Sequence, residues 1–107
     1  ALTDTLKTFG FKDDEIKTCA GTGITVDIRG TGPEEDKDGK VSSVAIRADM
    51  YGLPMPELNH DLEYKTTTDH AHMCGHDGHM VTILGTAQVL NNNRDKIPSN
   101  KFVRLLF

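Results

Sequence analysis

The order of three segments in the second half of the chain restricts the fold more than any other feature of the sequence. Residues 41–50 (VSSVAIRADM) are rich in small and branched apolar residues, which is typical of a strand, and residues 101–107 (KFVRLLF) form a second, almost wholly apolar run. Between them, apolar residues recur at the helical period: Met80, Ile83, Leu84, Ala87 and Leu90. Strand, crossover helix and strand form a βαβ unit, so the sequence predicts an α/β fold with an open, mixed, partly parallel sheet and packed helices.

The same patterns predict the remaining elements. The crossover helix should begin near residues 76–78 and end at the asparagine tract after residue 90. Upstream we expect a short helix that stops at Gly10, a short strand over 15–19, an alternating strand over 24–29 and a solvated connection over 30–40. We also expect the strand at 41–50 to be more buried than the one at 24–29, and the strand at 101–107 to be buried on both faces.

Composition limits the partners that this chain can have. Its 107 residues make one domain at most, its formal net charge is −4, and its 12 lysines and arginines are scattered, so we expect neither a nucleic-acid nor a membrane partner. No apolar stretch approaches the roughly 20 residues that span a bilayer. Two distant cysteines are interpreted as reduced thiols, which favours a cytoplasmic location; an organellar or secreted protein without its leader would look the same.

Side chains that can bind metal are concentrated in residues 68–79 (TDHAHMCGHDGH), which hold four of the five histidines and one of the two cysteines. This segment lies in the loop and first turn of the predicted crossover, and Asp49 lies at the carboxyl end of the preceding strand. In open α/β sheets, functional groups gather beyond the carboxyl ends of the strands. The sequence therefore predicts that Asp49 and the histidine cluster share one site.

Cys74 and His76 are the strongest candidates for metal binding. A thiolate and an imidazole separated by one glycine could converge on one ion at the roughly 2.0–2.3 Å typical of zinc. Asp69 or Asp77 could hold a ligating imidazole through its second nitrogen. Three other interpretations stay open: Asp77 as a helix N-terminal residue, Cys74 as a small buried apolar group, and Cys74 with a nearby histidine as a nucleophilic or redox thiol.

Four motifs in order resemble a known enzyme family. IRADMYGLPMPE, HMCGHDGH, MVTILGTAQVL and VRLLF are similar to the amidohydrolase branch of the metallo-aminoacylase and carboxypeptidase family, over about residues 23–107. Members include hippurate hydrolase, N-acetyl-diaminopimelate deacetylase and plant hydrolases of auxin–amino acid conjugates. The resemblance implies that residues 1–107 are the N-terminal part of a catalytic domain of zinc-peptidase-like fold, truncated and without the family's satellite domain.

The resemblance also implies roles for particular residues. Cys74 and His76 fall on ligands of a binuclear metal centre, and Asp49 falls on a catalytic aspartate that orients a ligand and tunes the site. Supporting or substrate-contacting roles are implied for three further residues: His72, Asp77 and His79. The ions would be zinc or, alternatively, manganese, cobalt or nickel. The substrate would be an N-acyl amino acid or a dipeptide-like small molecule, and the parent protein would form a homodimer through the satellite domain.

The chain departs from the family pattern at several points. Tyr51 stands where the family usually has aspartate, Met73 stands where it usually has alanine, and the family's adjacent glutamates would follow residue 107. We therefore expect the parent protein to be a metal-dependent amidohydrolase, and these residues alone to be inactive and marginally stable. The alternative is a non-catalytic, degenerate relative that acts as a structural or interaction module in a larger assembly.

Overall fold

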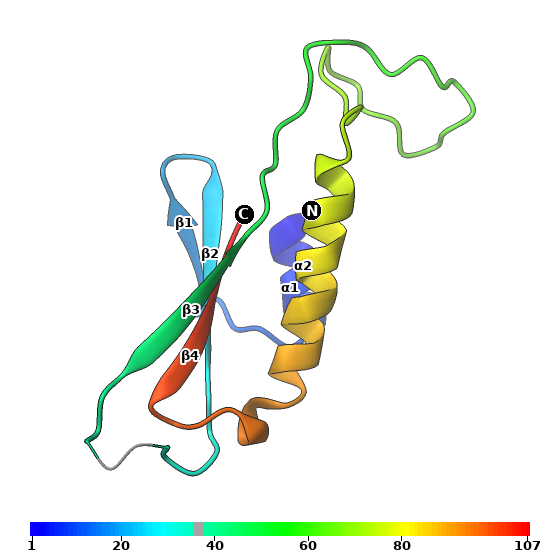
Figure 1. Ribbon diagram of the computed structural model, residues 1–107. Coiled ribbons are helices and arrows are strands. Elements are labelled where there is room, and N and C mark those ends of the chain that lie inside the picture. Colours follow the sequence, from blue (N-terminus) through cyan, green and yellow to red (C-terminus); the bar gives the residue numbers. More distant parts are fainter. Residues whose placement is uncertain (36–37) are drawn as a thin grey trace.

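A computed structural model describes residues 1–35 and 38–107. The strands form one four-stranded sheet. Figure 1 shows the helices beside this sheet and a long loop that projects beyond them. The elements, in chain order, are α1 (Leu2–Thr8), β1 (Ile16–Cys19), β2 (Gly23–Arg29), β3 (Ser42–Arg47), α2 (His76–Asn91), a short 3-10 helix η1 (Arg94–Lys96) and β4 (Lys101–Leu106). The predicted helices and strands are all present. None of the described helices is both long and apolar enough to cross a membrane.

The sheet is mixed, as predicted. Its strand order is β1-β2-β4-β3. The pairs β1–β2 and β2–β4 are antiparallel, whereas β3 and β4 are parallel and are connected through α2. The predicted βαβ unit is therefore confirmed. It places the carboxyl ends of β3 and β4 at the same edge of the sheet, with Arg47 opposite Leu106.

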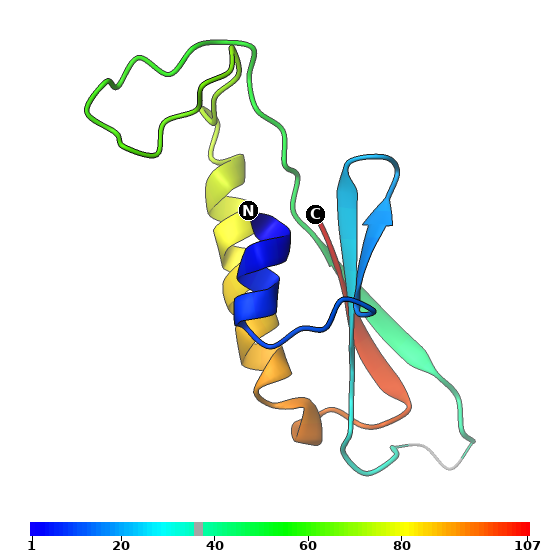
Figure 2. The same cartoon turned by 180° about the vertical axis from the view of Figure 1, so that it is seen from behind.

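One face of the sheet carries the core. Alternation along β2 points Val26 and Ile28 to the same side, where both are fully buried, and Leu105 of β4 joins them. Figures 1 and 2 show α1 and α2 together on one side of the sheet. Leu6 of α1 and Ala87 of α2 are fully buried in the same cluster. The core is thus a single interface between one helical layer and one sheet face.

Two of the burial expectations were wrong. β3 is exposed along its whole length, whereas β2 contains fully buried residues. The reason is position: β3 is an edge strand that pairs with β4, while α2 packs against β2. β4 is not buried on both faces either, because Arg104 is exposed on the face opposite Leu105 and binds Asp27 there. Apolar content therefore predicted strand formation but not which layer covers each strand.

The connection between β2 and β3 is less solvated than predicted at its start. Gly30 and Gly32 are buried, and a Cβ atom on Gly30 would lie 2.2 Å from the carbonyl oxygens of Ile97 and Pro98. The buried Asn100 side chain accepts a hydrogen bond from the Glu35 N–H and donates one to the Glu35 carbonyl. This part of the connection packs against the approach to β4. The remainder of the prediction falls partly on Asp36 and Lys37, which lie outside the described residues.

Candidate functional site

Asp49 lies just beyond the carboxyl end of β3, where the sequence predicted it. Its Oδ2 atom is 3.1 Å from Nη2 of Arg47, and its Oδ1 atom accepts a hydrogen bond from the Tyr51 N–H at 3.0 Å. Partial burial raises the pKa of Asp49, but these two hydrogen bonds and the charges of Arg47 and His76 outweigh that effect and hold the pKa below its usual value. Asp49 is thus an ionised carboxylate within electrostatic range of His76.

His76 is the first residue of α2, and its ring contacts those of Tyr51 and His79. The Tyr51 ring meets it edge-to-face, with 6.0 Å between ring centroids and 79° between ring planes. The His79 ring, one turn along the helix, meets it at 6.0 Å and 78°. The Nδ1 atom of His76 is buried and has no hydrogen-bond partner among the described residues. A buried imidazole nitrogen without a hydrogen-bond partner can use its lone pair to bind a zinc ion.

Gly75 makes the sharp turn between Cys74 and His76 possible. Its φ of +91° lies in the left-handed region, which L side chains rarely adopt, and it is the N-cap of α2. The bend that the sequence predicted at this glycine is therefore present. The Cys74 thiol is free and exposed, so the interpretation of Cys74 as a small buried apolar group was wrong.

The other histidines and acidic residues of the segment are less closely involved. His72 and Asp77 are exposed. Within the described chain, no hydrogen bond or ring contact joins His76 to His72, Asp69 or Asp77. Nor do the described residues include a group of three or more histidine, cysteine, aspartate or glutamate side chains placed to hold a metal ion. The structure thus brings Asp49, Tyr51, His76 and His79 together, and leaves His72 and Asp77 at the periphery.

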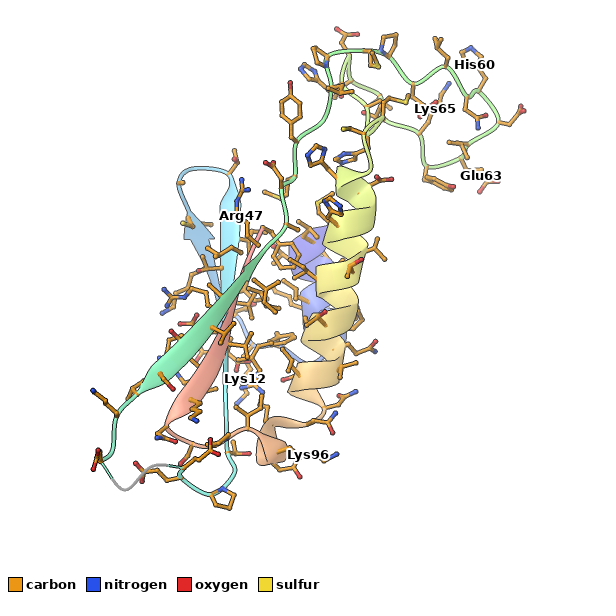
Figure 3. The ribbon with its side chains drawn as sticks, in the orientation of Figure 1. Lys12, Arg47, His60, Glu63, Lys65 and Lys96 are labelled. Atoms are coloured by element: carbon orange, nitrogen blue, oxygen red, sulfur yellow. The ribbon has the colours of Figure 1, made fainter. Side chains whose placement is uncertain are left out.

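The projecting loop is separated from this group by a short two-stranded contact. Leu53 and Ala71 exchange two backbone hydrogen bonds, at 2.9 and 3.0 Å, so residues 54–70 leave and rejoin the body at one point. Figure 3 shows His60, Glu63 and Lys65 on this loop, far from Arg47 at the end of β3. The fifth histidine is therefore not part of the candidate site.

A cleft of about 420 Å³ lies against Asp49 and Tyr51 at the carboxyl edge of the sheet. The β1–β2 turn forms its far wall, from Cys19 to Ile24, and Leu106 and Phe107 contribute from β4. Among the described residues, Cys74 and His76 do not line it, whereas Tyr51 both lines it and contacts His76. The sequence analysis missed the β1–β2 turn because only strand pairing, and no local motif, brings it to this edge.

Comparison with known proteins covers nearly the whole chain. No protein-family model matches it. The chain is 38% identical to thermostable carboxypeptidase 1 of Saccharolobus solfataricus over 109 aligned residues, which cover 99% of this chain and 24% of that protein. It is 37% identical to an N-acyl-L-amino acid amidohydrolase of Geobacillus stearothermophilus, with 97% of this chain and 25% of that protein covered. The chain therefore spans about a quarter of the length of these relatives.

A solved structure shares the fold. A Bacillus subtilis protein, described as a dinuclear metal binding peptidase from the M20 family, superposes with a TM-score of 0.72 and 28% sequence identity. The match covers 99% of this chain and 27% of that protein. Sequence and fold comparisons both support the resemblance that the four motifs indicated.

Proposed function

Because this chain belongs to the M20 family of amidohydrolases and metal peptidases, we propose that the full-length protein containing it is a metal-dependent amidohydrolase. It would cleave the amide bond of N-acyl amino acids or similar conjugates, and residues 1–107 would be the N-terminal part of its catalytic domain. The observation that carries the proposal is the buried, unpartnered Nδ1 of His76, beside an ionised aspartate at the carboxyl edge of the sheet.

The donor set of this segment fits a divalent ion. We assign Cys74 and His76 as ligands, because Cys74 presents a free, exposed thiol and His76 an imidazole nitrogen that makes no hydrogen bond to the described residues. The thiolate favours zinc, although manganese, cobalt and nickel also accept mixed sulfur, nitrogen and oxygen donors. When bound, two such ions would polarise the scissile carbonyl and lower the pKa of water. Further ligands would come from the rest of the full-length protein.

The chain's own residues would prepare that chemistry. Asp49 is held by Arg47 and by the Tyr51 N–H, so its charge has a fixed position near His76, from which it would orient a ligand and tune the site. The His79 ring also contacts the His76 ring and would restrict its movement. We assign His72 and Asp77 to substrate contact or to support of the site, a role that requires parts of the protein outside these residues.

Other properties of the full-length protein follow from this proposal. Its partner would be a small N-acylated amino acid or a dipeptide-like molecule, and it would act as a homodimer. A cytoplasmic location is supported by Cys19 and Cys74, which are both free thiols, because disulfides are rare in that compartment.

One observation favours a second candidate function. Tyr51 occupies a position next to Asp49 at which a carboxylate would be expected, and a phenol is a poorer ligand at neutral pH. A non-catalytic relative acting as a structural or interaction module would tolerate this change. Such a module would not require Cys74 to bind metal.

Substitution of each cysteine separates the two candidates. In the full-length protein, Cys74→Ser should reduce the metal that copurifies by at least about tenfold, because it removes a ligand. Cys19→Ser removes the other free, exposed thiol and should leave metal content unchanged. Elemental analysis, with an N-acyl amino acid hydrolysis assay in parallel, measures both effects. Negligible metal in the unsubstituted protein and in both variants would exclude the hydrolase and favour the module.

A further inference from the structure

The His76 ring is held in an unusual way. A metal-binding imidazole ordinarily donates its second ring N–H to a carboxylate, a backbone carbonyl or water, and that bond fixes the ring orientation. Neither ring nitrogen of His76 has such a partner among the described residues: Nδ1 is the nitrogen proposed to bind metal, and no hydrogen bond joins Nε2 to the rest of the described chain. Its ring instead makes two edge-to-face contacts, one with the Tyr51 ring at 79° and one with the His79 ring at 78°. The orientation of His76 thus depends on ring contacts where a hydrogen bond would be expected.

Tyr51 is the better fixed of the two contacts. His79 belongs to the same helix as His76, so a contact between them cannot fix the position of that helix relative to the sheet. Tyr51 belongs to the segment that follows β3, and the backbone on both sides of it is held by hydrogen bonds. Its own N–H bonds Asp49 at 3.0 Å, and Leu53 exchanges two hydrogen bonds with Ala71 just after it. The Tyr51 ring therefore couples the end of β3 to the first residue of α2.

This contact lies outside the hydrophobic core. Tyr51 is 54% exposed and is not a member of the buried cluster or of the hydrophobic residues packed against it. Truncation of Tyr51 should therefore leave the packing of β2, β4 and α2 intact. A change at His76 after such a truncation can then be assigned to the lost ring contact.

We propose that Tyr51 is a positioning residue, whose aromatic ring holds the His76 imidazole in the orientation needed to bind metal. This inference rests on the proposed function. Edge-to-face attraction depends on the ring and not on the hydroxyl. A phenylalanine at position 51 should therefore still hold the His76 ring in place, whereas an alanine should not.

Cobalt binding to the full-length protein tests this prediction. With Co²⁺ as the probe, Tyr51→Ala should weaken binding about tenfold, which is the lower end of the loss when a partner of a metal-binding imidazole is removed. Tyr51→Phe should stay within about twofold of the unsubstituted protein, since the ring contact is retained. Tyr64→Ala removes the other tyrosine, which is 84% exposed on the projecting loop, and should have no effect.

A second measurement does not require metal. In the metal-free protein, Tyr51→Ala should shift the NMR signals of the His76 ring protons, because they lose the field of the adjacent aromatic ring, and Tyr64→Ala should leave them in place. Unchanged His76 signals in Tyr51→Ala would overturn the inference, as would equal losses of cobalt affinity in Tyr51→Phe and Tyr51→Ala. Cobalt affinity that is unaffected in Tyr51→Ala overturns it while leaving the proposed function standing. An unsubstituted protein that binds no cobalt contradicts the proposed function itself, whatever the NMR result.

Discussion

At the scale of single residues, the geometry of the site depends on the backbone of Gly75. The chain arrives from the projecting loop and must reverse into α2 between the two proposed ligands, Cys74 and His76. Gly75 achieves this with a φ of +91°, and a Cβ atom there would meet nothing within 4 Å. The requirement for glycine is thus conformational and not a matter of space.

Alanine substitutions at two glycines test this requirement. Gly75→Ala should lower the free energy of unfolding by about 1–2 kcal/mol, because an L residue is strained in the left-handed region. Gly85 lies inside α2, has no positive φ, and also has nothing within 4 Å of an added Cβ. Gly85→Ala should therefore stabilise the protein by about 0.5–1 kcal/mol. Urea unfolding measures both changes, and equal effects at the two positions would show that Gly75 is not strained by alanine.

At the scale of elements, β2 and β4 are joined by polar as well as apolar contacts. On the face opposite the core, Nε and Nη2 of Arg104 bind the two carboxylate oxygens of Asp27 at 2.6 and 2.7 Å. The Arg29 and Arg104 guanidinium groups both lie over the Phe102 ring, at 5.0 and 5.7 Å from its centroid. This pairing explains why a charged residue is tolerated in the middle of a largely apolar strand.

The Asp27–Arg104 pair should make stability depend on pH. The hydrogen bond from Arg104 lowers the pKa of Asp27, against a smaller opposing effect of partial burial. A carboxylate with a lowered folded-state pKa stabilises the fold above its unfolded pKa of about 3.9, and this stabilisation is lost as the pH falls through the folded-state pKa. Arg104→Met replaces the guanidinium with an apolar side chain and should lower the denaturant midpoint at pH 7 by a small amount, because the pair is partly exposed.

Denaturant unfolding at several pH values provides the measurement. The difference between Arg104→Met and the unsubstituted protein should shrink progressively as the pH is lowered below about 4. Lys40→Met, which removes an exposed charge outside this pair, should show little difference at any pH. A deficit for Arg104→Met that is constant with pH would mean that packing, and not the ion pair, accounts for it.

The positions of the helices and strands were more predictable from sequence than the burial of each one. Periodicity located α2 and the four strands, because a helix or strand that packs against a core must repeat its apolar residues at its own period. The same apolar content at Val44 and Ile46 led to the wrong expectation that β3 is buried. Burial depends on which element covers a strand, and no pattern local to residues 42–47 encodes that α2 lies over β2 instead.

At the scale of the whole molecule, these residues form an extended body. The radius of gyration is 16.6 Å, compared with about 13 Å for a compact domain of this size. The longest dimension is 57 Å, against 23 and 22 Å for the others. A single helical layer and a loop that projects past α2 account for the shape, as Figures 1 and 2 show. Much apolar surface on β3 consequently faces solvent in this part of the protein.

Exposed apolar residues on an edge strand should promote self-association of the polypeptide of residues 1–107. Val44 on β3 and Val89 on α2 are both 63% exposed, so they are matched in accessible surface. Val44→Lys should raise the concentration at which light scattering first increases, because a lysine on an edge strand opposes pairing with a second chain. Val89→Lys should have a much smaller effect, since a helix offers no unpaired backbone. Equal effects would indicate association through apolar surface in general.

Residues of the candidate site could be predicted from sequence only where they lie close together in one segment or motif. Cys74, Gly75 and His76 are consecutive, so their chemistry could be inferred from the order of residues alone. Tyr51 was noticed as a departure from the family pattern, but its contact with His76 depends on how the end of β3 meets the start of α2. The wall formed by the β1–β2 turn depends on the pairing of β2 with β4, which joins residues about 80 positions apart.

The strand order has a consequence for synthesis on the ribosome. β4 is inserted between β2 and β3, although it is made last of the four. The β1–β2 hairpin can close as soon as residue 29 emerges, but β2 and β3 must each wait for residues 101–106 before gaining that neighbour. At bacterial and eukaryotic elongation rates, residues 48–100 take on the order of seconds to make. For that interval the nascent chain displays two apolar strands whose facing edges are unpaired, and a chaperone can bind there. The arrival of β4 covers those two facing edges.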